Sequence, residues 1–139
     1  MTDHRQPDAG LRHAAIGFAV AVVLHNADHL RRGTSSISGL LQTAGWLGLA
    51  ISVTAIVLVL TGNRFGPIAA ISAGFPLAIG FLAAHWLPTW SSFSDSFVEG
   101  GASWLSILAS LAEVAGALWL GVAGLLAVRR AGSLSASIA

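Results

Sequence analysis

The chain has 139 residues, of which 55% are hydrophobic and only 9% charged, and its mean hydropathy is +0.76. This composition excludes an ordinary soluble domain and predicts an all-α integral membrane protein, because a bilayer core favours long apolar segments. The seven basic residues are all arginines and form no single patch, which argues against a nucleic-acid partner, and the absence of cysteine excludes disulfides and thiolate metal ligands.

Four apolar segments predict four transmembrane helices in a single domain. They are residues 11–30, 40–60, 67–87 and 102–128. Each holds about 20 residues or more, which at about 1.5 Å per residue crosses a hydrocarbon core of about 30 Å. The connections are mostly short and therefore predict an up-down-up-down bundle. Residues 1–10 and 131–139 are expected to be short tails.

The arginines predict on which side of the membrane each end of the bundle lies. If the N-terminus is inside, five arginines are inside, and only Arg31 and Arg32 are outside. The inside group is Arg5, Arg12, Arg64, Arg129 and Arg130. Since cytoplasmic loops carry the excess of positive charge, both termini are predicted to be cytoplasmic, with the protein in the plasma membrane.

The first segment ends with His25-Asn26-Ala27-Asp28-His29, a cluster of ionisable residues in an apolar run. At helical spacing His25, Asp28 and His29 fall within an arc of about 100°. Gly17 and Ala21 precede them in four-residue steps, and small residues let membrane helices approach closely. We therefore expect this face to point into the bundle, where ionisable groups are costly and mark functional sites.

Two further ionisable residues are predicted to face inward. His85 lies within about 20° of the direction of the small residues Gly74 and Ala78, and Glu113 shares a helix face with Ala117. His85 is expected at the same depth as the histidines of the first segment. Glu113 is about ten residues inside its segment, so it joins them only if that helix begins later or is tilted.

Imidazole and carboxylate donors on three helices predict a transition-metal site that opens to the outside. The candidate ligands are His25, His29, His85, Asp28 and Glu113. Such donors suit Zn, Fe, Mn or Cu, and the sequence does not distinguish among them. The implied role is redox chemistry or metal handling, and no residue is assigned a catalytic function.

Other interpretations of the same residues remain open. Asp28 precedes Arg31 and Arg32 by three and four residues, which favours an ion pair at the helix end over metal ligation. A b-type haem held by His85 and one histidine of the first segment is the second reading. In the third, the chain is an accessory or transporter subunit whose polar residues only join helices. In this third interpretation the partners are the lipid bilayer and either a homo-oligomer or a larger membrane complex.

The loop between the third and fourth segments is predicted to lie in the outer interface. Within residues 89–99, Trp90, Phe93 and Phe97 recur at the spacing of a short amphipathic helix. The tryptophans are typical of an aromatic belt at the membrane surface. A lid over the metal site is the alternative, with Trp90, Asp95 and Glu99 along the access path.

Overall fold

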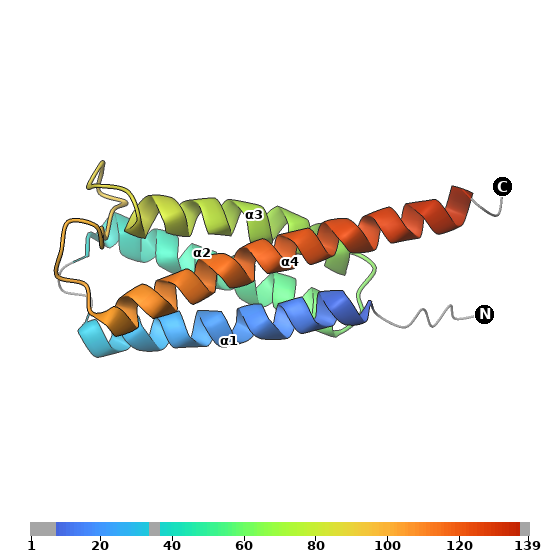
Figure 1. The fold of residues 1–139 in the computed structure, drawn as a ribbon, viewed down its shortest axis with the longest axis horizontal. Coiled ribbons are helices and arrows are strands. Elements are labelled where there is room, and N and C mark those ends of the chain that lie inside the picture. Colours follow the sequence, from blue (N-terminus) through green and yellow to red (C-terminus); the bar gives the residue numbers. More distant parts are fainter. Residues whose placement is uncertain (1–7, 34–36, 137–139) are drawn as a thin grey trace.

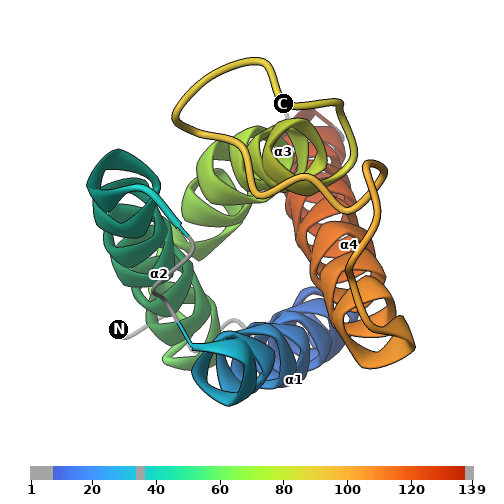
Figure 2. The ribbon, with the colours of Figure 1, turned by 90° about the vertical axis from the view of Figure 1, so that its left-hand side faces the viewer.

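The computed structural model describes residues 8–33 and 37–136, with side chains up to Gly132. These residues form four helices and no strand. The helices are α1 (Ala9–Arg32), α2 (Gly39–Leu60), α3 (Gly66–His85) and α4 (Trp104–Ala136). Each helix begins at the end of the bundle where the preceding one ends (Figure 1). Because α1 contacts α2 and α4, and α3 contacts the same two helices, the four form a ring when viewed along the bundle (Figure 2).

Three of the four helices are long and apolar enough to cross a membrane. These are α2, α3 and the part of α4 from Trp104 to Gly132. The helix α1 is less apolar because it carries Arg12, Asp28, Arg31 and Arg32 as well as three histidines. The predicted membrane character is thus supported by three helices, and their outward faces expose large apolar side chains such as Leu47 and Ile79.

Local signals in the sequence explain where the helices begin. The Asp8 carboxylate accepts a hydrogen bond from the Leu11 amide at 3.2 Å and caps α1, and the Ser38 hydroxyl caps α2 in the same way. Pro67 lies in the first turn of α3, where its missing N–H costs nothing. Burial opposes ionisation of Asp8, but the Leu11 amide and the Arg130 guanidinium hold the pKa of Asp8 below its usual value.

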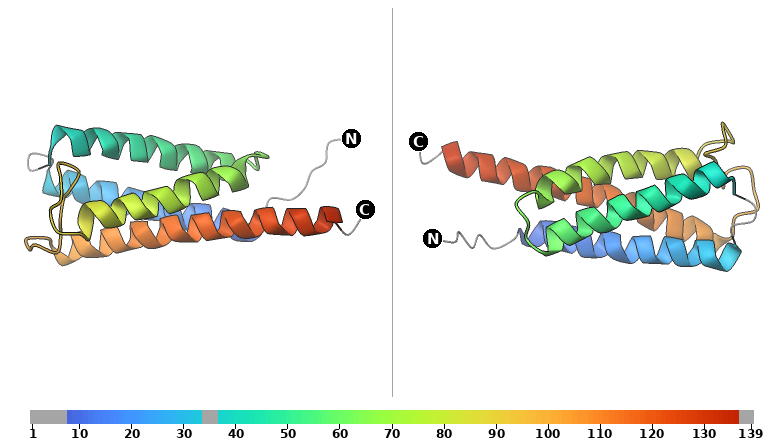
Figure 3. Two further views of the ribbon diagram at one scale, coloured as in Figure 1. Left: turned by 90° about the horizontal axis from the view of Figure 1, so that it is seen from above. Right: turned by 180° about the vertical axis from the view of Figure 1, so that it is seen from behind.

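The end of α4 differs from the prediction. The helix continues to Ala136, so residues 131–136 of the expected tail over residues 131–139 are helical, and the remaining residues lie outside the described part. Apolar character ends near Val128, whereas helical hydrogen bonding does not require apolar side chains. In the extension, Arg130 forms an ion pair of 2.6 Å with Asp8 at the start of α1. The long extension of α4 beyond the other helices is visible from two further sides in Figure 3.

The predicted amphipathic helix within residues 89–99 was wrong. This segment consists of turns, bends and backbone without regular secondary structure. The amides of Asp95 and Phe97 donate to the carbonyls of Ala84 and His85, at 2.9 and 2.8 Å. These carbonyls belong to the last turn of α3 and have no partner within their own helix. The loop therefore completes the end of α3 instead of forming a helix of its own.

Small residues set the distance between α3 and α4. Gly74 and Ala78 are buried, as their predicted inward face requires. A Cβ atom added to Gly74 would lie 2.5 Å from the Gly121 nitrogen and 2.6 Å from the Ala117 oxygen. The two helix backbones are thus in contact at this crossing, as is common where glycine replaces larger side chains in membrane bundles.

We predict that Gly74→Ala destabilises the bundle, although alanine is the better helix former. The added methyl group meets backbone atoms that cannot rotate away, and overpacking of this kind costs about 1–3 kcal/mol. Gly80→Ala is the matched control, because among the described residues no atom outside its own helical turn lies within 4 Å of the added Cβ. It should be neutral or stabilise α3 by up to about 1 kcal/mol. Denaturant unfolding of both variants in detergent measures the difference, and equal stabilities would contradict the close approach of α3 and α4.

Candidate functional site

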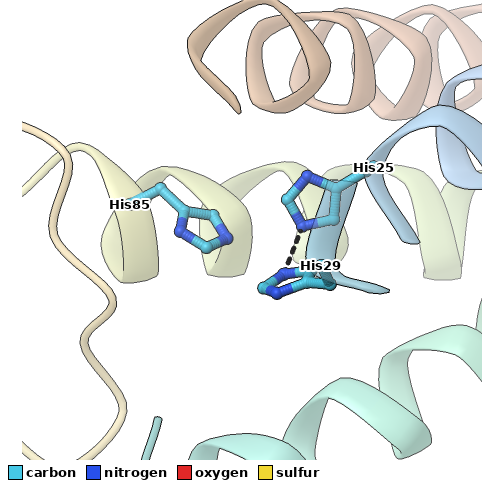
Figure 4. Close-up of side chains that lie close together, drawn as sticks. All are labelled: His25, His29 and His85. Carbon is cyan, nitrogen blue, oxygen red and sulfur yellow. Dashed lines mark hydrogen bonds between the residues drawn. The ribbon is translucent and has the colours of Figure 1, made fainter. Parts of the chain in front are cut away.

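Three histidines gather at the end of the bundle where α1 and α3 finish. His25 and His29 come from the last two turns of α1, and His85 is the last residue of α3 (Figure 4). The ring centroids are 4.6 Å apart for His25 and His29, 5.1 Å for His25 and His85, and 6.0 Å for His29 and His85. One nitrogen from each ring lies within 4.8 Å of the other two. The expectation that these three residues are neighbours is therefore confirmed.

The positions of the rings follow from the buried face of α1. His25 and Asp28 continue the row of small and apolar residues that includes Phe18 and Ala21. His25 and His85 are 5% and 4% exposed, and His29 is half-buried nearer the end of the helix. The spacing of four residues places His29 directly above His25, and their Nε2 atoms are 2.9 Å apart.

Glu113 of α4 joins the inner side of the cluster. Its Oε2 atom lies 3.3 Å from Nδ1 of His25, and its side chain is almost fully buried. The two atoms are not aligned as a hydrogen bond, and neither has another hydrogen-bond partner among the described residues. Because His25 lies one turn deeper than His29, it reaches the level of Glu113. The structure therefore settles the question of depth that the sequence left open.

Asp28 forms ion pairs with the two arginines that follow it. Arg31 donates to Oδ1 from Nη2 at 2.7 Å, and Arg32 donates to Oδ2 from Nε at 3.0 Å. Both carboxylate oxygens are thus occupied, while the side chain itself is buried. This arrangement is the helix-end ion pair that competed with metal ligation, and it leaves Asp28 outside the cluster of imidazoles.

The two arginines connect α1 to other elements. Arg31 donates from Nη2 to the hydroxyl groups of Ser103 and Ser106, at 2.8 and 3.2 Å, near the start of α4. Arg32 donates from Nη2 to Oδ2 of Asp95 at 3.0 Å, and its guanidinium lies 5.2 Å from the ring centroid of Phe97. The same Nη2 atom is 3.2 Å from Nδ1 of His29. Arg32 thus contacts α1, the loop and the histidine cluster.

The loop after α3 covers His85. The carbonyl oxygen of Asp95 lies 3.0 Å from Nδ1 of His85, and the Asp95 carboxylate lies 3.6 Å from the same atom. One face of the His85 ring stacks on the ring of Phe97, with a centroid distance of 4.6 Å. The loop therefore fixes the orientation of His85 by one hydrogen bond and one ring contact.

The other two residues expected along an access path shape the loop. Trp90 donates from Nε1 to the Ala83 carbonyl at 2.9 Å. Glu99 accepts hydrogen bonds from the hydroxyl and the amide of Thr89, which hold the pKa of Glu99 below its usual value. Trp90 thus connects the loop to α3, and Glu99 hydrogen-bonds within the loop. Of the three residues expected along the access path, Asp95 contacts the histidine cluster.

The sequence prediction missed the serines of α4. Ser106 and Ser110 are fully buried, and Ser110 accepts a hydrogen bond from Nε1 of Trp86 at 3.0 Å. With Ser103 and Glu113 they follow a spacing of three, four and three residues, which places all four side chains on one face of a helix. This spacing is the pattern in the sequence from which the buried serines could have been predicted.

The groups beside the rings bear on where each ring carries its proton. Nδ1 of His85 faces a carbonyl oxygen at hydrogen-bond distance, so its proton belongs on Nδ1 and its lone pair on Nε2. Nδ1 of His25 lies 3.3 Å from the Glu113 carboxylate without the alignment of a hydrogen bond. In metal-binding histidines, the ring nitrogen that does not bind the metal usually faces a carbonyl or carboxylate group. The carbonyl oxygen of Asp95 and the carboxylate of Glu113 lie beside Nδ1 of His85 and of His25 in the corresponding positions.

Comparison of the chain with known protein families, with characterised proteins and with solved structures gives no match.

Proposed function

We propose that the protein binds a transition-metal ion through His25, His29 and His85 at the outer end of a four-helix membrane bundle. The observation that carries this proposal is the convergence of three ring nitrogens within 4.8 Å in a largely buried position. Neutral imidazole is the commonest metal ligand in proteins. Asp28 and Glu113 act around the ion instead of binding it, since Asp28 pairs with arginines and Glu113 faces the Nδ1 atom of His25.

The spacing of the rings is close to what an ion requires. Metal–nitrogen bonds of about 2.0–2.1 Å place tetrahedral ligand atoms about 3.3 Å apart. His25 and His29 already have Nε2 atoms 2.9 Å apart. The widest pair is at most 4.8 Å apart, so the ligand atoms need to approach one another by up to about 1.5 Å to bind one ion.

The ligand set narrows the choice of metal. Imidazole nitrogens suit Zn, Cu and Fe, whereas Mn prefers carboxylate and water oxygens. Because the acidic residues stand outside the group of imidazoles, Zn, Cu or Fe fits better than Mn. Three ligands leave a further position open for water or a substrate, as in sites that do chemistry or pass an ion on.

The packing around the rings favours a bare ion over haem. A b-type haem requires two histidines on opposite faces of a flat macrocycle. Here His25 contacts His29 at a centroid distance of 4.6 Å, and one face of His85 stacks on Phe97. A porphyrin between His25 and His85 would have to displace these neighbours, whereas an ion would not.

The proposal places the site at the outer surface of the plasma membrane. It requires α1 to cross the bilayer beside α2, α3 and α4, with its charged residues inside the bundle or at its ends. Exposed Val20, Val23 and Leu24 give α1 an apolar outward face, which supports lipid contact. The arginine distribution supports cytoplasmic termini, so that the loop with Asp95 and Glu99 faces outward.

Metal analysis of the full-length protein in detergent tests the proposal. Wild-type protein expressed with Zn²⁺, Cu²⁺ and iron should retain a stoichiometric metal ion and show no Soret band. His25→Ala and His85→Ala should each abolish retention of the metal, because each removes an imidazole that already has a carbonyl or carboxylate group beside its other ring nitrogen. His13→Ala is the matched control, since His13 is an exposed histidine near the opposite end of α1.

Size-exclusion chromatography and circular dichroism show whether each variant remains a folded bundle. Folded His25→Ala and His85→Ala proteins that keep their metal would refute the site. A Soret band in the wild type would replace the ion by haem. A wild-type protein with neither metal nor haem would favour the accessory role, in which the histidines only hydrogen-bond helices together.

Single cysteines test the orientation, because the natural chain has none. Ser92→Cys in the exposed part of the loop should react with a membrane-impermeant maleimide added to intact cells. Gly132→Cys, near the end of α4, should react only after the membrane is permeabilised. The reverse pattern would place the cluster on the cytoplasmic side and contradict the arginine rule for this chain.

A further inference from the structure

The three histidines differ in what faces the ring nitrogen that points away from the cluster. Nδ1 of His85 faces a carbonyl oxygen, and Nδ1 of His25 faces a carboxylate. Nδ1 of His29 instead lies 3.2 Å from Nη2 of Arg32. A guanidinium has donors and no acceptor, so Nδ1 of His29 must accept this hydrogen bond.

The contact with Arg32 fixes the proton on the other nitrogen of His29. A neutral imidazole whose Nδ1 accepts carries its hydrogen on Nε2. The Nε2 atom of His29 therefore donates to Nε2 of His25 at 2.9 Å (Figure 4). In this tautomer His29 has no lone pair for a metal ion, and an ion that binds Nε2 of His25 displaces this hydrogen bond.

Arg32 is held in this place by groups from two elements. It donates from Nε to Asp28 at 3.0 Å and from Nη2 to Asp95 at 3.0 Å. Its side chain is 20% exposed, so it can extend toward the membrane surface while its aliphatic part stays in the bundle. If Nη2 leaves His29, the imidazole can move its proton to Nδ1 and present Nε2 to the cluster.

We propose that Arg32 is a positioning residue that controls whether His29 is the third metal ligand. This inference rests on the proposed metal function and deepens it. With Arg32 in place, a metal ion is bound by His25 and His85 alone, and the site of three histidines proposed above forms when Arg32 moves away from His29. A single hydrogen bond from Arg32 therefore keeps His29 from acting as the third ligand.

Substitution of Arg32 in the full-length protein tests this proposal, with Cu²⁺ as the probe. In Arg32→Gln the amide oxygen can accept a hydrogen bond from Nδ1 of His29, which favours the tautomer that binds metal. We expect Cu²⁺ to bind about 10–100-fold more tightly than in the wild type, which is the range typical of changes in groups that hydrogen-bond to metal ligands. Electron paramagnetic resonance should show three coordinated nitrogens in the variant and two in the wild type.

Two control variants separate this effect from the loss of charge. Arg31→Gln removes the same charge and another ion pair of Asp28, but Arg31 contacts serines and no histidine in the described structure. Arg32→Lys keeps a donor without an acceptor beside His29. Both should keep the affinity and the nitrogen count of the wild type. An increase in Arg31→Gln equal to that in Arg32→Gln would overturn the proposal.

His29→Ala keeps the proposal testable if Arg32→Gln does not fold. Because His29 is withheld in the wild type, its removal should leave Cu²⁺ bound with two nitrogens. Loss of Cu²⁺ as complete as in His25→Ala would overturn the inference, and so would equal spectra of Arg32→Gln and wild type that both contain the metal. Absence of Cu²⁺ from wild type and Arg32→Gln alike would refute the metal function itself, and this inference with it.

Discussion

The paired charges of Asp28 hold together the end of the bundle that carries the three histidines. A buried carboxylate is stable only when its charge is compensated, and Asp28 is compensated by Arg31 and Arg32 on its own helix. These arginines then reach two other elements. Arg31 binds serines at the start of α4, and Arg32 binds Asp95 in the loop that covers α3. One carboxylate thereby connects α1 to the elements around His85.

The same network sets the chemical state of the histidines. Asp95 receives Arg32 on its carboxylate and faces Nδ1 of His85 with its carbonyl, so the loop that anchors the arginine also orients a ring. Arg32 in turn donates to His29. Hydrogen bonds run from Arg32 through His29 to His25, and each constrains the next because a neutral imidazole has one donor and one acceptor. Glu113 lies beside the far nitrogen of His25 without a hydrogen bond.

Backbone contacts far from the cluster determine whether the rings meet. The approach of α3 and α4 at Gly74 and Gly121, and the contact of Gly116 with Phe18 of α1, fix how these helices lie against one another. A few degrees of tilt over a helix of this length move its end by several ångströms. The distance from His25 to Glu113 is therefore a property of the whole bundle.

The sequence by itself determined the helices, the inward faces and the three histidines as neighbours, because helical periodicity and the positions of small residues are local patterns. It did not determine that Glu113 reaches His25, since depth depends on helix tilt and no local pattern encodes tilt. Nor did it reveal that residues 89–99 hydrogen-bond to the end of α3, where free carbonyls outweigh the aromatic spacing. The spacing predicted that Arg32 pairs with Asp28, but only the tertiary structure placed Asp95 beside the same guanidinium, because this contact joins residues from two separate elements. The sequence locates the polar cluster, and the packing decides which group each of its ring nitrogens faces.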